Sequence, residues 1–344
     1  MERNYWLDSL RGFAAIWVVI FHLNEIIPFE TNFYTSFAKY GWLGVPIFFI
    51  LSGYCISMVT QKSTSPHEFM LRRIFRIFPP YYASIGVVLM VVLTRVICSG
   101  YNDVSPIPST ITEILATITL LTEPATEVGT MNWVYWSLTY EIVFYLIVAL
   151  TLYRRSFSNY VFLLICILCF IPGTYETVGK TRGPAVVEGL FFLREWLLFG
   201  AGLGLYQFTN KKKSIGTLIL LISFFGIAFT KDLAVGIVSL FTLISIYFSH
   251  SSLLSKKYWL SKVGEYSYSL YLIHVPIGVY LLLQFRKGIF LDNLILHILY
   301  DFIVLGILIL ISYWFYRLVE KPSILIGKAV IKRNISIIKG YYAR

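Results

Sequence analysis

The residues of this sequence that could do chemistry are ionisable side chains inside apolar runs. Arg11 and His22 occur together in LDSLRGFAAIWVVIFH, and Glu141 occurs in NWVYWSLTYEIVFYL. Such groups cost at least about 2.5 kcal/mol each inside a membrane, so each is a candidate functional residue. A histidine oriented by a carboxylate is a common general base for removing the proton of a hydroxyl.

Arg11 and His22 lie on one side of the helix that would carry them. At 100° per residue, their separation of eleven positions leaves them within about 20° of the same face and about 16 Å apart along the axis. Arg11 falls near one boundary of the run, where it could meet an anionic ligand, and His22 lies toward the other end. Asp8, three residues before Arg11, can pair with it. The alternative is a snorkelling arginine and a packed histidine bonded to backbone.

Glu141 is expected at a depth similar to that of His22. It lies about 12 Å into its run when the count starts at Trp133, and the two helices are antiparallel. A buried carboxylate needs a partner, so we predict that Glu141 pairs with His22, fixes its tautomer and stabilises its imidazolium. Hydrogen bonds of Glu141 to Trp133, Trp136 or the backbone are the alternative.

Three arginines precede the third apolar run, in the sequence RRIFRIFPPYY. The planar guanidinium grips a phosphate in two places, so Arg72, Arg73 and Arg76 are candidate ligands for the phosphates of a cofactor. The alternative is that they are ordinary positive charges that flank a membrane span and contact phospholipid.

A second histidine, His274, stands two residues before Pro276 in the run YSLYLIHVPI. A proline-broken helix beside a histidine is typical of a cavity lining, although a packed histidine fits the same pattern. We therefore group His274 with Trp133, Trp136 and Ser137 as candidate substrate-binding residues.

The elements that position these residues must be membrane helices. Of the 344 residues, 57% are hydrophobic and 14% are charged, whereas soluble proteins carry about 25% charged residues. This composition excludes a soluble globular protein. The net charge of +11 could suggest nucleic acid, but the charges fall between apolar runs, so the lipid bilayer is the expected partner. The CxxC of Cys166 and Cys169 lies in an apolar run without a second ligand pair, and no metal site is predicted.

The apolar runs predict an all-α, polytopic membrane helix bundle of about ten transmembrane helices. A helix needs about 20 mostly apolar residues to cross roughly 30 Å of hydrocarbon, and the fifth, seventh and eighth runs are short. The segment 111–121 is too short to span and is predicted to be a re-entrant or interfacial helix. The predicted spans are residues 10–27, 41–59, 82–97, 134–153, 160–172, 190–208, 215–229, 233–248, 268–285 and 294–316.

The distribution of Lys and Arg predicts the orientation of the bundle. The segments that would share a side with the N-terminus hold most of the basic residues, whereas the loop 99–132 has four acidic residues and no Lys or Arg. Because cytoplasmic segments carry the excess of Lys and Arg, both termini are predicted to be cytoplasmic. The first run lacks a small-residue cleavage site and is predicted to remain as a span. The predicted membrane domain is residues 1–320, followed by a basic cytoplasmic tail, 321–344.

Six ordered motifs resemble the acyltransferase-3 family of integral membrane acyltransferases. One arginine and one histidine with ten residues between them would be a weak signal, but six motifs in order along nearly the whole chain are specific. The motifs are LDSLRGFAAIWVVIFH, GVPIFFILSGY, RRIFRIFPPYY, WSLTYEIVFY, YSLYLIHVPI and YRLVEKP.

The resemblance implies ten spans, an acyl-CoA donor that is commonly acetyl-CoA, and acceptors such as bacterial surface polysaccharides. It also implies that His22 is the catalytic histidine, Arg11 its basic companion, Arg73 and Arg76 the paired arginines, and Glu141 the acidic residue. Some members append a periplasmic esterase-like domain, and this chain resembles the stand-alone type.

We therefore predict a membrane O-acyltransferase of the bacterial inner (plasma) membrane. It would move an acyl group, commonly acetyl, from acyl-CoA to a hydroxyl of a cell-envelope polysaccharide, such as an O-antigen unit, or of its lipid-linked precursor. The phosphates of coenzyme A would meet the arginines, and its pantetheine arm would reach toward His22. Direct transfer and an acyl-histidine intermediate both fit the sequence. The competing class is a proton-coupled transporter or flippase, which the lack of correspondence between the two halves of the sequence disfavours.

Overall fold

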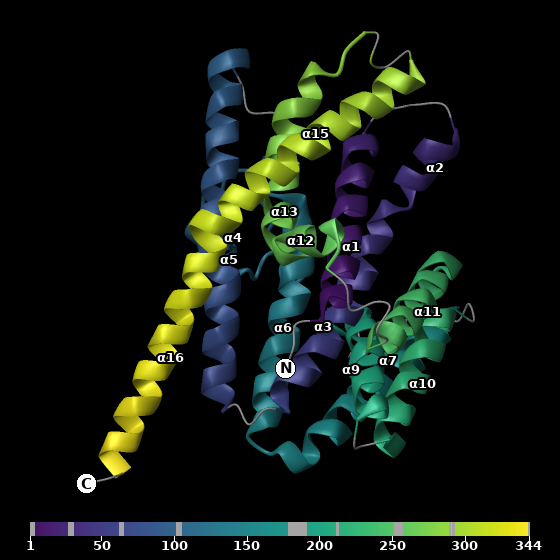
Figure 1. Cartoon of the computed structure of the whole chain (residues 1–344), viewed down its shortest axis with the longest axis vertical. Coiled ribbons are helices and arrows are strands. Elements are labelled where there is room, and N and C mark those ends of the chain that lie inside the picture. Colours follow the sequence, from purple (N-terminus) through teal and green to yellow (C-terminus); the bar gives the residue numbers. More distant parts are fainter. Residues whose placement is uncertain are drawn as a thin grey trace.

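All regular structure in the described residues is helical (Figure 1). The computed structural model describes residues 4–26, 31–61, 65–100, 105–177, 191–210, 213–250, 257–288, 290 and 293–342. The principal helices are α1 (Tyr5–Asn24), α2 (Phe33–Lys39), α3 (Gly44–Thr60), α4 (Pro66–Ser99), α5 (Ile111–Thr119), α6 (Trp136–Leu152), α7 (Arg155–Thr177), α9 (Leu193–Thr209), α10 (Lys213–Thr230), α11 (Leu233–Tyr247), α12 (Trp259–Glu265), α13 (Ser267–Ile273), a π-helix (His274–Leu282), α15 (Leu294–Phe315) and α16 (Lys321–Tyr342). The predicted all-α class is confirmed for this part of the chain.

The chain has several helices that can cross a membrane, so it is an integral membrane protein. Each predicted span overlaps a helix, but α7 and α11 offer only shorter apolar stretches. Helix α9, which overlaps the span predicted over 190–208, is also not among the segments long and apolar enough, so the count of ten spans stays a prediction. Within the described residues, seven segments are long and apolar enough: Tyr5–Asn24, Phe33–Thr60, Pro66–Cys98, Trp133–Leu152, Lys213–Thr230, Ser267–Phe285 and Leu294–Arg333.

The third predicted span is part of a much longer helix. Helix α4 begins at Pro66 and runs for 34 residues, with Ser65 as its N-cap and Pro79 and Pro80 inside it. Proline suits the first turn of a helix, because the amide hydrogens there have no partner within the helix. The start predicted at residue 82 was therefore wrong, and the arginines that precede it lie on the same helix as the span.

Two segments outside the predicted spans pack onto α4. The short helix predicted over 111–121 is present as the nine-residue α5, and the hydroxyl of Tyr81 donates to the carbonyl of Thr117 at 2.7 Å. The segment predicted as a tail begins as α16, whose Ser323 hydroxyl donates to the carbonyl of Phe75 at 2.6 Å. Figure 1 shows α16 running beside the lower half of α4.

Glycines let α3 and α9 approach each other closely. A Cβ atom at Gly53 would lie 2.0 Å from the carbonyl oxygen of Phe199, and one at Gly202 would lie 1.9 Å from that of Ile50. Small residues at such contacts are typical of membrane helix pairs, because backbone packing replaces the hydrophobic effect as the source of attraction. The pair α3 and α9 is therefore a fixed frame for the side chains it carries.

We expect Gly202→Val to lower the free energy of unfolding by about 1–3 kcal/mol or more, because the added carbons must push α3 away from α9. The measurement is unfolding of the purified protein in detergent. Gly86→Val is the matched control, since nothing lies within 4 Å of a Cβ at that helical position. Equal stability of the two variants would contradict a close contact between these helices.

A buried polar network fixes the last turn of α1, which carries His22. The Asn24 side chain donates to the carboxylate of Asp301 at 2.7 Å. Asp301 also forms an ion pair with Arg286, and the two side chains are 1% and 0% exposed. Arg286 donates in turn to the carbonyl of Leu23 at 3.2 Å. The network ties the end of α1 to α15 and so sets the position of His22.

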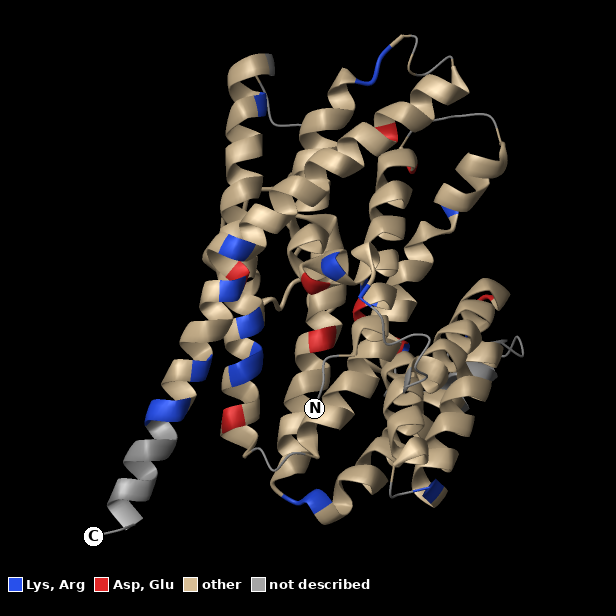
Figure 2. Cartoon of the chain, in the orientation of Figure 1, with Lys and Arg blue, Asp and Glu red and all other residues tan. Residues whose placement is uncertain are grey.

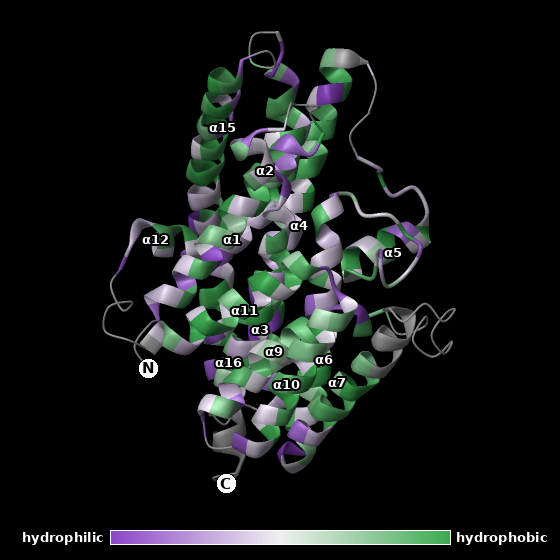
Figure 3. Cartoon of the chain, turned by 90° about the vertical axis from the view of Figure 1, so that its right-hand side faces the viewer, coloured by the Kyte–Doolittle hydropathy of each residue, from purple (hydrophilic) through white to green (hydrophobic). Residues whose placement is uncertain are grey.

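Charge is unevenly placed along the molecule. Figure 2 shows Lys and Arg along the lower half of α4, along α16 and at the lower ends of the bundle. Figure 3 shows that apolar residues predominate along many of the helices, and many large apolar side chains on them are exposed, such as Leu93, Leu233 and Leu310. Basic residues are therefore concentrated toward one end of the molecule, although a few lie at the other end, and the exposed apolar side chains suit contact with lipid.

Candidate active site

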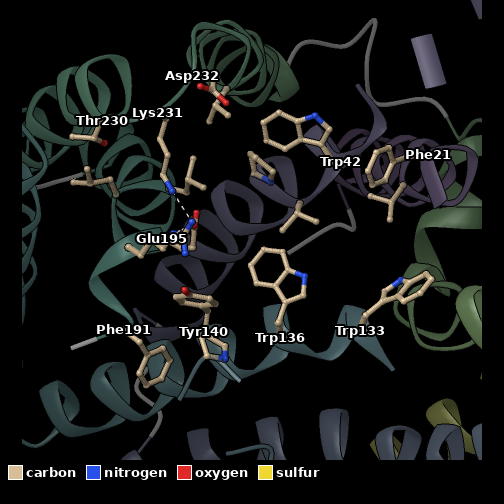
Figure 4. A pocket seen from close by; sticks show the side chains of 18 of the residues that line it. Phe21, Trp42, Trp133, Trp136, Tyr140, Phe191, Glu195, Thr230, Lys231 and Asp232 are labelled. Carbon is tan, nitrogen blue, oxygen red and sulfur yellow. Dashed lines mark hydrogen bonds and ion pairs between the residues drawn. The ribbon is translucent and has the colours of Figure 1, made fainter. Parts of the chain in front are cut away.

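A cavity of about 1290 Å³ opens beside the last turn of α1. Its walls come from α1, the starts of α6 and α9, and the connection between α10 and α11, and Figure 4 shows aromatic side chains surrounding it. The residues that give it chemical character are His22, Glu25, Trp42, Trp133, Trp136, Tyr140, Phe191, Arg194, Glu195, Lys231 and Asp232. We call this space the large cavity.

His22 lies in the large cavity with a carboxylate of its own. Its Nδ1 atom is 3.1 Å from Oε2 of Glu25, three residues further along the chain. An ionised carboxylate only accepts hydrogen bonds, so Nδ1 carries the proton and Nε2 has a free lone pair. The ring also lies 6.0 Å from that of Trp133 and 5.2 Å from that of His274, between centroids. The site therefore presents an oriented base to the cavity.

A second, smaller cavity of about 270 Å³ lies among α1, α3, α4, α6 and α13. Arg11, Arg73 and Arg76 all line it, so the structure brings together three arginines from two helices. Arg11 donates to Sγ of Cys55 at 3.1 Å. Its guanidinium also lies 3.4 Å from the carboxylate of Asp8, which confirms the predicted pairing of these two residues. We call this space the small cavity, and its cationic lining suits an anionic ligand.

Glu141 lines the small cavity, and its predicted pairing with His22 was wrong. Its carboxylate accepts from the hydroxyl of Ser52 at 3.2 Å and from that of Tyr145. Depth alone could not reveal this, because Glu141 lies about 140° around α6 from Trp136, which faces the large cavity. The carboxylate that holds His22 is Glu25, which sequence reasoning missed although it lies one turn away in the same run.

Arg72 is not part of the small cavity, which corrects its assignment with Arg73 and Arg76. Its guanidinium donates to Oε1 of Glu68 at 2.5 and 3.2 Å, one turn earlier on α4. Arg73 instead extends over the ring of Tyr145, 5.6 Å from its centroid. A carboxylate four residues before Arg72 was visible in the sequence and could have separated it from the others.

The two cavities meet at a shared wall. Val45 and Tyr271 line both of them. The hydroxyl of Tyr271 lies 2.7 Å from that of Ser137 and donates to the carbonyl of Val134 at 3.0 Å. These bonds hold the ring between the cationic lining and the cavity that contains His22.

The four predicted substrate-binding residues do not share one cavity. Trp133 and Trp136 line the large cavity, whereas Ser137 lines the small one. His274 lines neither cavity. Its Nδ1 atom donates to the carbonyl of Tyr271 at 2.7 Å. Its Nε2 is buried and has no hydrogen-bond partner among the described residues. The predicted proline break is not seen: α13 ends at Ile273 and continues directly as a π-helix that contains Pro276, so the helix changes its winding without being interrupted.

Glu195 and Lys231 are the main cavity residues that sequence reasoning missed. Their side chains form an ion pair, with Nζ and Oε1 2.8 Å apart. They belong to α9 and to the connection after α10, and only the fold brings them together. No local spacing could have revealed them.

Fold and site together define an integral membrane protein in which a cationic cavity meets a cavity with an oriented histidine. The chain belongs to the acyltransferase-3 family, whose profile, described as an acyltransferase domain, matches residues 4–317. The family resemblance drawn from the six motifs is thereby confirmed.

The curated relatives of this chain include proteins named as O-acetyltransferases. The O-acetyltransferase OatA of Staphylococcus aureus is 28% identical over 329 residues, which cover 82% of this chain and 52% of that protein. The peptidoglycan O-acetyltransferase OatA of Listeria monocytogenes is 39% identical over 90 residues, which cover 24% of this chain and 13% of that protein. The chain thus spans 52% or less of the length of these curated relatives. No solved structure shows a significant match.

Proposed function

We propose that this chain is an O-acyltransferase of the bacterial plasma membrane, which moves an acyl group from acyl-CoA to a hydroxyl of a cell-envelope carbohydrate or its lipid-linked precursor. The observation that carries the proposal is the shared wall of the two cavities at Tyr271 and Val45. One cavity offers arginines for phosphate and the other offers a histidine for a hydroxyl. Relatives named as O-acetyltransferases support acetyl as the acyl group.

Acetyl-CoA, or another acyl-CoA, is the proposed donor in the small cavity. Arg73, Arg76 and Arg11 would hold its phosphates, because guanidinium groups bind phosphate oxygens in pairs. The basic end of the molecule in Figure 2 supports a cytoplasmic entry for the donor and cytoplasmic termini. Glu141 is proposed to position Tyr145, whose hydroxyl donates to the Glu141 carboxylate. The guanidinium of Arg73 lies over the ring of Tyr145, so Glu141 would act on the donor site through that ring.

The acceptor hydroxyl is proposed to bind in the large cavity beside His22. Nε2 of His22 takes the hydroxyl proton as the oxygen attacks the thioester carbonyl, and Glu25 stabilises the imidazolium that forms. A carbon–oxygen bond forms, the carbon–sulfur bond breaks, and the proton passes to the departing thiolate of coenzyme A. Trp133 and Trp136 are proposed to contact the acceptor, whereas Ser137 and His274 shape the wall by bonding to Tyr271.

We expect Glu25→Gln to lower kcat by about 2- to 5-fold, since the Glu25 side chain is 48% exposed and an ion pair screened by water contributes about 0.2–1 kcal/mol. The affinity for acetyl-CoA should be unchanged, because Glu25 does not line the small cavity. Steady-state kinetics and acetyl-CoA titration give the two values. Glu127→Gln, on the exposed loop before α6, is the matched control. Wild-type kcat in Glu25→Gln would show that Glu25 does not support His22.

One experiment separates acyl transfer from transport. The purified chain in lipid nanodiscs receives acetyl-CoA and bacterial envelope glycan, and the free thiol of coenzyme A is measured. A transferase releases thiol in proportion to the glycan acetylated, whereas a proton-coupled transporter or flippase consumes no thioester. Absence of both thiol and acetylated glycan would exclude the proposed function.

A further inference from the structure

One ion pair in the large cavity has no part in the proposed transfer step. Glu195 stands in the first turn of α9, and Lys231 follows the last residue of α10. Their side chains are 13% and 19% exposed and lie 2.8 Å apart. Figure 4 shows this pair on one side of the cavity, with Trp136 and Tyr140 nearby. A pair so placed can contact a ligand that fills the cavity.

The surroundings of the pair suit a ring that carries hydroxyl groups. Trp42, Trp136 and Tyr140 give the same cavity flat apolar surfaces on which the face of a sugar ring can lie. The ion pair leaves other lone pairs on the carboxylate of Glu195 and two further N–H groups on Lys231. Few polar groups among aromatic walls are the usual way in which a pocket fixes the orientation of a ligand.

The charges of the cavity disfavour an anionic ligand. Each basic side chain of the lining already has a carboxylate beside it. His22 lies 3.1 Å from Glu25. Lys231 and Arg194 lie 2.8 Å and 4.0 Å from Glu195. Asp232 adds a further negative charge to the same lining. A sugar carboxylate would compete with Glu195 for Lys231 and meet like charges, and such repulsion is an effective source of specificity.

We propose that Glu195 and Lys231 form the specificity site for the acceptor and select a neutral, hydroxyl-rich sugar over one that carries a carboxylate. The inference rests on the proposed acyl transfer and names the class of its acceptor. Glu195 accepts from one sugar hydroxyl and Lys231 donates to another, so the pair recognises two hydroxyls without a net charge.

The test uses three matched probes with acetyl-CoA and the full chain in nanodiscs. They are p-nitrophenyl glucoside, which is neutral, the corresponding glucuronide, which carries a carboxylate at C6, and the xyloside, which lacks C6 and so controls for the lost hydroxyl. The wild type should acetylate the glucuronide at least about tenfold less efficiently than the xyloside, as judged by kcat/KM from product mass. Equal efficiency for these two would overturn the proposal.

Glu195→Gln supplies the decisive comparison, because it removes one negative charge and releases the ammonium group of Lys231. The ratio of kcat/KM for glucuronide over xyloside should rise about tenfold or more, with acetyl-CoA affinity unchanged. Glu127→Gln should leave the ratio at its wild-type value. The double variant Glu195→Lys with Lys231→Glu restores a neutral pair and should return the wild-type ratio, which keeps the test valid if the single variant is unstable.

The outcomes separate this inference from the proposed function. An unmoved ratio in the folded Glu195→Gln variant, or acetyl-CoA binding with transfer to none of the three sugars, would overturn the specificity site alone. A wild type that neither binds nor consumes acetyl-CoA would overturn the proposed acyl transfer, and the inference with it.

Discussion

His22→Ala is expected to reduce acyl transfer by about 10²- to 10⁴-fold, which is the usual contribution of a positioned general base. The variant removes the imidazole whose Nδ1 atom lies 3.1 Å from the carboxylate of Glu25. The small cavity does not include His22, so the affinity for acetyl-CoA should stay at its wild-type value. The measurement pairs the initial rate of acetylated product with acetyl-CoA titration on the same preparation.

The appropriate control is His67→Ala, which changes an exposed histidine near the start of α4. It should leave both the rate and the affinity unchanged. Transfer at the wild-type rate by purified His22→Ala would remove His22 from the reaction. Loss of acetyl-CoA binding together with transfer would instead show that His22 supports the structure of the donor site.

The double variant Arg73→Lys with Arg76→Lys is expected to bind acyl-CoA about 10²- to 10⁴-fold more weakly. Lysine keeps the positive charge but loses the planar fork that bonds two phosphate oxygens, and each charged hydrogen bond contributes about 1.5–3 kcal/mol. Because the charge is retained, the orientation of the protein in the membrane should not change. Equilibrium titration with acyl-CoA gives the affinity, and protease or cysteine labelling gives the orientation.

Arg72→Lys is a matched control for that variant, because Arg72 is adjacent in sequence yet pairs with Glu68 outside the small cavity. It should bind acyl-CoA as the wild type does. High salt should weaken wild-type binding by screening the phosphates from the arginines. Unchanged affinity in the double variant would show that Arg73 and Arg76 are flanking charges and that the donor is held elsewhere.

The helices were predictable because apolar length is a local property of the sequence. Each predicted run overlaps a helix, and near Pro276 the helix changes from α to π winding at His274. The start of α4 was not predicted, since Arg72, Arg73 and Arg76 lower the local hydropathy without opposing helix formation. Composition therefore indicates where lipid contacts a helix better than where the helix begins.

Side-chain partners were predictable only where they lie within one or two turns. Asp8 beside Arg11 is such a pair, and Glu25 beside His22 could have been found in the same way. Glu141 was assigned to the wrong cavity because a count of depth ignores rotation about the helix axis. The pair of Glu195 and Lys231 depends on how α9 and α10 pack, and local sequence carries no sign of that.

The central proposal is that this chain transfers an acyl group from acyl-CoA to an envelope glycan by way of His22. Its most direct test is the mass of the envelope glycans from cells that express the wild-type chain, the His22→Ala variant or neither. Glycans from wild-type cells should be heavier by whole acetyl units, and those from the other two should match each other. Identical glycan masses in all three, with the wild-type protein present in the membrane, would contradict the proposed acyl transfer.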